Sequence, residues 1–374
     1  MNKATPLLFT PLQVGALSLP TRVCMAALTR LRADPKTGIP SDLHKEYYSQ
    51  RAGSAGFNLT ECTQVVPEGT SFLGSCGIHS EEQVQGWKNV TDAVHAKGGR
   101  IVLQIWHSGR AAHPDLHDGK QSISSSANPI REDARTAKGK VPHSTPKAME
   151  EEDFKYITHA FRKGAENAKK AGFDGLQLHC ANGYLMDQFL RDSPNQRKDK
   201  YGGSIENRCR FPLEIIDQLI EVFGADRVGV KVSPLGRFQD MSDSEPIALY
   251  SYFFEELNKR KVAFVEVMEK GEGFAGPSKE FHVDPETQMK GTVAENLKPF
   301  FKGIYIANNN FTYESANTAI EKGWADAVTF GRMFISNPDL VSRLQNGWPL
   351  NEPSVETFYF GGEKGYTDYP FYKL

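Results

Sequence analysis

His179, Asn182 and Tyr184 are the residues of this chain whose types and spacing most clearly predict chemistry. They follow an alternating run, residues 174–178, that is typical of a β-strand. Two neutral donors can hold one oxygen atom, and a phenol with an ordinary pKa of about 10 can deliver a proton beside it. This combination predicts a site that polarises a carbonyl and reduces an activated double bond. Alternatively, His179 and Asn182 cap the next helix and Tyr184 packs against it.

Short apolar runs that alternate with helical patterns must position these groups. The expected strands cover residues 22–27, 57–65, 100–106, 174–179, 227–233, 263–268, 303–308 and 325–331. Apolar residues at three- and four-residue spacing predict helices between them, including 84–96, 153–171, 205–223, 247–259 and 313–322. Eight strand–helix units favour an α/β fold of the closed (β/α)₈ TIM-barrel type. A doubly wound sheet is the alternative, but no G-x-G-x-x-G follows the first strand.

The segments outside this rhythm predict three further features. Glycines at 98, 172, 303 and 323 are expected to close helices in the left-handed conformation. The segment before Arg22 is expected to form a hairpin that closes the bottom of the barrel. The long polar segment 107–150 follows the third strand, which places it over the mouth. No linker divides the chain, so residues 1–374 are expected to form a single domain.

The ends of the last two strands have the character of a phosphate cradle. Asn309 and Asn310 tolerate positive φ and can present backbone N–H groups. Gly331 offers an unobstructed amide and Arg332 a guanidinium. Phosphate binding after strands seven and eight is a recurring use of this barrel. The alternative is a tight turn with a surface arginine.

Three other strand ends predict contacts to a flavin ring. The Gln104 amide can pair with a ring that has adjacent N–H and C=O groups, and the Thr29 hydroxyl can contact another edge. Lys231 would stabilise negative charge on the reduced ring. Phosphate and ring contacts across one barrel mouth together predict FMN.

Composition excludes several other classes of protein. The net charge is -2 and the pI is near 6.6, which predicts no nucleic-acid partner. No apolar run reaches the length of a membrane span, so no membrane partner is expected. Five scattered cysteines predict neither a disulfide framework nor an iron–sulfur cluster, and they favour a cytoplasmic location. His107, His113 and His117 are interpreted as a solvated loop, and no metal site is expected.

Several long motifs then identify a family. They are Ala27-Leu28-Thr29-Arg30, Gln104-Ile105-Trp106-His107, His179 with Gly183-Tyr184-Leu185, Asp187-Gln188-Phe189-Leu190-Arg191, the run from Tyr201 to Arg208, Ser336-Asn337-Pro338-Asp339-Leu340 after Gly331-Arg332, and Gly365-Tyr366-Thr367-Asp368-Tyr369-Pro370. With these motifs in order over nearly its whole length, the chain resembles the classical type of Old Yellow Enzyme family, the FMN-dependent NAD(P)H:enone reductases.

The resemblance implies a role for each motif residue. His179 and Asn182 would hold the substrate carbonyl, Tyr184 would donate the proton, and Trp106 and Tyr359 would line the substrate pocket. The residues implied to bind the cofactor are Ala27, Leu28, Thr29, Cys62, Gln104, Lys231, Asn309, Asn310, Gly331 and Arg332. Lys231 stands where the family usually has arginine, Asn309 and Asn310 where glycine is common, and Ala27 where proline is frequent.

The implied activity is that of an ene-reductase. NADPH or NADH would supply hydride, through tightly bound, non-covalent FMN, to the C=C bond of α,β-unsaturated carbonyl compounds, and nitro compounds or nitrate esters are further candidate acceptors. Two other classes stay open at this point. One is a flavin-free, phosphate-binding isomerase or aldolase, and the other is a non-catalytic flavin sensor. The residues do not choose between monomer and dimer.

Overall fold

A computed structural model describes residues 5–136, 138–270, 288–359 and 361–373. Each of the eight expected strands is present, and the second is split into two short pieces, β4 and β5. The barrel strands are β3 (Val23–Met25), β4 (Asn58–Leu59), β5 (Thr63–Gln64), β6 (Ile101–Trp106), β11 (Gly175–Cys180), β12 (Val228–Val232), β13 (Phe264–Met268), β14 (Ile304–Asn308) and β15 (Ala327–Phe330).

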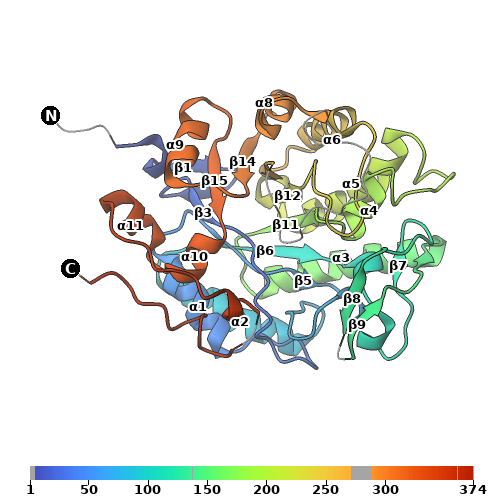
Figure 1. Ribbon diagram of the computed structural model, residues 1–374, viewed down its shortest axis with the longest axis horizontal. Helices are drawn as coiled ribbons and strands as arrows, with labels where there is room; N and C mark the ends of the chain where they lie inside the picture. The colour runs from blue at the N-terminus through green and yellow to red at the C-terminus, as the bar shows by residue number, and fades with distance from the viewer. Residues whose placement is uncertain (1–4, 137, 271–287, 360, 374) are drawn as a thin grey trace.

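All neighbouring strands of the barrel run parallel, and the sheet closes on itself. β11 pairs with both β6 and β12, and β15 pairs with β3, so the ring has no free edge (Figure 1). The register brings His179 beside Lys231 and Gln177 beside Gln104. Closure confirms the predicted (β/α)₈ barrel and excludes the doubly wound alternative.

The five helices predicted from apolar spacing are confirmed. They are α2 (Glu81–Ala96), α3 (Glu151–Lys170), α5 (Ile205–Phe223), α6 (Pro246–Arg260) and α9 (Tyr313–Glu321). Further helices are α1 (Asp42–Ala52), α4 (Leu185–Leu190), α8 (Val293–Leu297), α10 (Arg332–Ser336) and α11 (Leu340–Asn346). None of the helices in the described ranges combines the length and the apolar character needed to cross a membrane.

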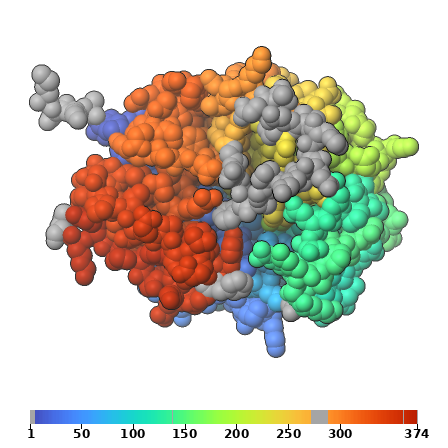
Figure 2. Space-filling model, in the orientation of Figure 1, coloured from blue at the N-terminus to red at the C-terminus, as the bar shows by residue number. Residues whose placement is uncertain are grey.

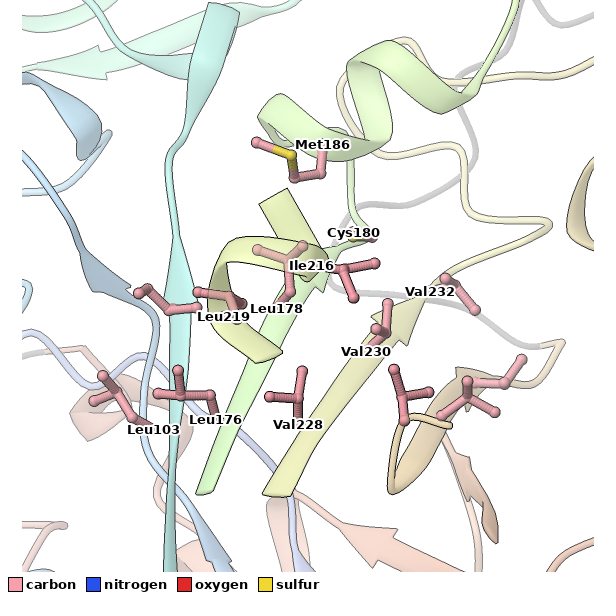
Figure 3. Close-up of a cluster of buried hydrophobic side chains, with 14 of the residues drawn as sticks. Leu103, Leu176, Leu178, Cys180, Met186, Ile216, Leu219, Val228, Val230 and Val232 are labelled. Atoms are coloured by element: carbon pink, nitrogen blue, oxygen red, sulfur yellow. The ribbon is translucent and has the colours of Figure 1, made fainter. Parts of the chain in front are cut away.

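Alternation along the strands separates an apolar outer layer from the barrel interior. Leu176 and Leu178 of β11 and Val230 of β12 belong to the same buried cluster as Ile216 and Leu219 of α5 (Figure 3). Because successive side chains of a strand point to opposite faces, the residues between them point inward. The interior of the barrel therefore receives Gln177 and Lys231.

The predicted N-terminal hairpin is confirmed and fills the amino end of the barrel. β1 (Leu12–Val14) pairs antiparallel with β2 (Leu17–Leu19), and their buried side chains pack against interior residues that include Phe57 and Phe264. At the turn, Gly15 has φ +54°, and a Cβ there would lie 2.0 Å from the Asp226 carbonyl oxygen. The close approach of this turn to the barrel therefore requires glycine.

Three of the four predicted helix-closing glycines have the expected conformation. Gly98, Gly172 and Gly323 have φ of +73°, +86° and +70°. The prediction for Gly303 was wrong, because its φ is not positive and the preceding turn is a short 3₁₀ helix, Lys298–Phe300. A Cβ at Gly303 would lie 2.8 Å from the ring of Phe301, so close packing explains this glycine instead.

The long segment after β6 has more structure than a loop. β7 (Ile123–Ser124) pairs with β10 (Lys147–Ala148), and β8 (Asp133–Thr136) forms a hairpin with β9 (Gly139–Pro142). Arg110 donates to the carbonyl oxygens of Asn128 and Gln239, which ties the segment to the barrel end. Figure 2 shows it in teal, facing the red C-terminal residues.

Candidate active site

His179 lies at the carboxyl end of β11 and is 3% exposed. Burial, together with the positive charge of Lys231, holds the pKa of His179 well below its ordinary value. The imidazole is therefore neutral at physiological pH. Its Nδ1 atom is buried and has no hydrogen-bond partner in the part of the chain that the structure describes. Because buried polar atoms are nearly always paired, this atom indicates a ligand position.

A strained turn presents Asn182 next to this histidine. Asn182 has φ +57°, and its backbone N–H donates to Ser233 Oγ at 2.8 Å. Gly183 follows at φ +74°, and a Cβ there would lie 2.9 Å from Met241. The backbone N–H of Gly183 donates to Asp187 Oδ2 at 2.9 Å. Backbone contacts thus hold the turn, and within the described ranges no hydrogen bond occupies the side chain of Asn182.

Tyr184 is the third residue of this site and directly precedes α4. Its ring centroid lies 5.2 Å from that of His179 and 4.5 Å from that of Trp106. Burial raises the pKa of Tyr184 above its ordinary value, so the phenol keeps its proton. The alternative that His179 and Asn182 cap the next helix was wrong, because the N-cap residue of α4 is Tyr184, and its side chain makes no capping hydrogen bond.

Below these groups, a chain of hydrogen bonds crosses the barrel interior. The Cys62 thiol donates to Gln104 Oε1 at 3.0 Å, and Gln104 Nε2 donates to Gln177 Oε1 at 2.6 Å. Gln177 Nε2 in turn donates to Glu266 Oε2 at 2.7 Å. Lys231 Nζ lies 3.2 Å from Glu266 Oε1. The structure therefore links three of the predicted cofactor residues through two residues, Gln177 and Glu266, that the sequence analysis missed.

Thr29 lies beside the start of this chain. Burial raises the pKa of the Cys62 thiol to about 12, and the Thr29 hydroxyl acts in the opposite direction. Ala27, Leu28 and Thr29 are partly exposed, whereas β3 before them is buried. The change in exposure marks the place where the barrel end opens.

The expected phosphate-binding residues lie on two adjacent turns. Asn309 and Asn310 have φ of +89° and +56°. These two asparagines therefore adopt the positive φ that glycine tolerates most readily, at positions where glycine is common in the family that the chain resembles. The strands that precede the two turns pair in register, with Asn308 opposite Thr329. The Asn309 side chain donates to the Glu269 carbonyl oxygen at 3.0 Å, which leaves backbone groups as its means of holding a ligand.

Gly331 and Arg332 form the other side of this pair of turns. A Cβ at Gly331 would lie 3.2 Å from Leu28 Cδ2, so the glycine lets the turn approach the end of β3. Arg332 is exposed at the surface. It is the first residue of α10 and lies at the same rim as the backbone groups of Asn309 and Asn310.

Tyr359 reaches the site from the far end of the sequence. It is 37% exposed, and its electrostatic interactions include Tyr184 and Arg332. The guanidinium of Arg30 donates to the Phe358 carbonyl oxygen at 2.8 Å and that of Arg32 to the Thr357 carbonyl oxygen at 2.7 Å. These two buried arginines anchor the segment that carries Tyr359, and sequence reasoning missed this role.

The donor set fits an FMN molecule. The interior supplies amide, hydroxyl and ammonium groups, and the rim supplies an arginine and two positive-φ turns. The buried Trp106 Nε1 atom, like His179 Nδ1, has no hydrogen-bond partner among the described residues. A flavin bound within reach of these neutral donors and the protonated phenol would be suited to the reduction of a polarised double bond.

The loop histidines serve local structure, and the interpretation of a solvated loop was wrong for His107, whose side chain is buried. The Nδ1 atoms of His107 and His113 accept hydrogen bonds from the backbone N–H groups of Gly109 and Asp115. The Nε2 atom of His117 lies 2.7 Å from the Thr70 carbonyl oxygen. The three imidazoles therefore point to separate backbone partners.

Comparison with known proteins identifies relatives of this chain. Residues 7–351 match the NADH:flavin oxidoreductase / NADH oxidase family. The chain is 42% identical, over 99% of each protein, to a probable flavin mononucleotide-dependent alkene reductase of Leishmania infantum. A solved structure of morphinone reductase in complex with tetrahydroNAD is similar, with 43% identity, a TM-score of 0.89 and 98% of each chain covered. So is an old yellow enzyme homologue from Zymomonas mobilis, with 37% identity, a TM-score of 0.91 and 98% of this chain and 99% of that chain covered.

Proposed function

The chain belongs to the NADH:flavin oxidoreductase / NADH oxidase family, that of the Old Yellow Enzymes, and from this we propose that it is an ene-reductase that uses FMN. NADPH or NADH reduces the cofactor, and the acceptor is the C=C bond of an α,β-unsaturated carbonyl compound. One observation carries the proposal. A neutral histidine, whose Nδ1 atom has no hydrogen-bond partner among the described residues, lies 5.2 Å, ring to ring, from a protonated tyrosine at the end of β11.

Residues from every part of the barrel mouth would hold the cofactor. Gln104 and Thr29 would contact the ring, and Lys231 would place its positive charge beside it. Asn309, Asn310, Gly331 and Arg332 would bind the phosphate. Ala27, Leu28 and Cys62 would add further contacts to the cofactor. When bound, FMN supplies the hydride-transfer chemistry that the side chains of this protein lack.

The protein's own groups act on the substrate. His179 and Asn182 would donate hydrogen bonds to the carbonyl oxygen and stabilise the charge that develops there. Because the imidazole is neutral, it polarises the oxygen without giving up a full proton. Tyr184 would deliver its proton to the α-carbon, and Trp106 and Tyr359 would shape the pocket that orients the double bond.

Family membership favours this function over the two alternatives. A flavin-free isomerase or aldolase does not fit a family of flavin oxidoreductases. A non-catalytic flavin sensor has no need for a protonated phenol beside a neutral histidine and an asparagine. The structure of morphinone reductase with tetrahydroNAD supports a nicotinamide reductant. We also propose that residues 1–374 act as one domain and that the protein works in the cytoplasm, which the five free, buried cysteines support.

The purified protein tests the proposal directly. It should be yellow, release FMN on denaturation in about one equivalent, and oxidise NADPH or NADH when cyclohexenone is added. Chromatography separates FMN from FAD and riboflavin. Stoichiometric FAD, a colourless protein, or bound FMN without turnover of any enone would each contradict it.

A further inference from the structure

A fully buried carboxylate lies next to the residues expected to hold the flavin. Glu266 on β13 accepts hydrogen bonds from side chains on three other strands: Lys231 Nζ at 3.2 Å, Thr329 Oγ1 at 2.8 Å and Gln177 Nε2 at 2.7 Å. An ionised carboxylate accepts hydrogen bonds and donates none. Three donors around one carboxylate therefore fit an ionised Glu266, and none of the roles assigned above uses this charge.

Glu266 also fixes the direction of the hydrogen-bond chain. Because the carboxylate must accept, Gln177 turns its Nε2 toward Glu266 and its Oε1 toward Gln104. Gln104 then donates with Nε2 and accepts from the Cys62 thiol with Oε1. The orientation of the Gln104 amide is thus set by a residue two hydrogen bonds away.

The same carboxylate balances the charge of Lys231. An ammonium group has three donors, and Glu266 Oε1 and Asn308 Oδ1 accept two of them, at 3.2 Å and 3.4 Å. The side chains of Lys231 and Glu266 are 6% and 0% exposed. Water screens such a buried pair poorly, so a neighbouring cofactor experiences both charges.

We propose that Glu266 is a positioning residue that lowers the reduction potential of the bound FMN by offsetting the positive charge of Lys231, and that orients Gln104 through Gln177. The inference rests on the proposed function, since it requires FMN at this site. Reduction adds electrons to the cofactor, which a nearby cation favours and a nearby carboxylate opposes. The buried pair thus makes the flavin a stronger reductant than Lys231 alone would.

Potentiometry of the FMN-loaded protein tests the sign of this effect. Glu266→Gln keeps the shape of the side chain and removes its charge. We expect the equilibrium between oxidised and reduced flavin to shift at least tenfold toward the reduced form, which is about 30 mV for a two-electron couple. Lys231→Met should shift it in the opposite direction, and the double variant should fall between the two single variants.

A second carboxylate–lysine pair provides a matched control. Asp326 precedes β15, at the amino end of the barrel, and lies 3.0 Å from Lys298 Nζ. Asp326→Asn should leave the flavin potential at the parent value. If Glu266→Gln does not fold, the double variant, which removes both buried charges, is compared with Lys231→Met and should have the higher potential.

Two results separate failure of the inference from failure of the proposed function. A parent protein without FMN or without enone turnover contradicts the proposed function. A folded, FMN-containing Glu266→Gln protein with the parent potential, or with a lower one, overturns the inference alone. Equal potentials of the double variant and Lys231→Met also overturn it.

Discussion

The indole ring of Trp106 meets the phenol ring of Tyr184 edge to face, with centroids 4.5 Å apart and planes at 83°. The two residues come from different strand ends, β6 and the turn after β11, and both are buried. Edge-to-face pairs contribute about 0.5–1.5 kcal/mol beyond the area they bury. Trp106 therefore restricts the orientation of the phenol from which we expect the proton to come.

The two proposed carbonyl donors predict a loss of ligand binding. A phenol bound through its oxygen should use the same hydrogen bonds as the substrate carbonyl. His179→Ala and Asn182→Ala should each weaken binding, because loss of one such donor costs roughly 2.7–4 kcal/mol in comparable sites. Titration of a phenol, followed by the change in flavin absorbance, measures the affinity.

Exposed residues of the same types serve as controls for this experiment. His159 and Asn89 are exposed on the outer helices. The His159→Ala and Asn89→Ala variants should therefore bind the phenol as the parent protein does. If both site variants keep the parent affinity, His179 and Asn182 do not form the binding pocket.

His107 predicts that the protein loses stability in mild acid. Burial lowers the pKa of His107 from 6.5 to about 4. Below pH 6.5 the unfolded chain binds a proton that the folded chain refuses until about pH 4, so stability falls as the pH drops through this window. From pH 7 to pH 5 the loss from this residue is about 2 kcal/mol.

Urea unfolding at the two pH values measures this loss. His107→Gln should be less stable than the parent at pH 7 but should lose less stability at pH 5, whereas the exposed His159→Gln should follow the parent. Parent-like pH dependence in His107→Gln would show that His107 does not contribute.

Local sequence patterns predicted the barrel because they report local geometry. The strand at 100–106 was predicted from its short apolar run, and the helix at 205–223 from apolar residues at three- and four-residue spacing. Such patterns occur in any fold in which the element buries one face. The same patterns locate the ends of strands, and in a parallel barrel all carboxyl ends meet at one mouth. His179, Gln104 and Lys231 could therefore be placed together before the structure was known.

Those local patterns could not predict contacts between side chains that are distant in the sequence. Gln177 and Glu266 each lie within an apolar strand, and only the closed barrel reveals that they point toward each other. A polar residue at an inward position of a buried strand was the signal that could have found them. Arg30 and Phe358 are 328 positions apart, and no local pattern predicts their contact. Gly303 was misinterpreted because a glycine required by packing and one required by positive φ look the same in sequence.

Tyr184 should separate the two half-reactions of the enzyme. Reduction of the cofactor by NADPH or NADH needs no proton from this phenol, whereas reduction of an enone needs one at the α-carbon. The burial that raises the pKa of Tyr184 keeps it protonated throughout the neutral range.

Tyr184→Phe retains the ring that packs on Trp106 and removes only the hydroxyl. Because positioned general acids contribute typically 10²–10⁴-fold, the variant should be reduced at nearly the parent rate and reoxidised by cyclohexenone at least a hundredfold more slowly. Rapid-mixing absorbance follows both steps, and Trp106→Phe, which keeps the hydroxyl, should be far less impaired in the second. Reoxidation of Tyr184→Phe by the enone at the parent rate would assign the proton to another acid or to water.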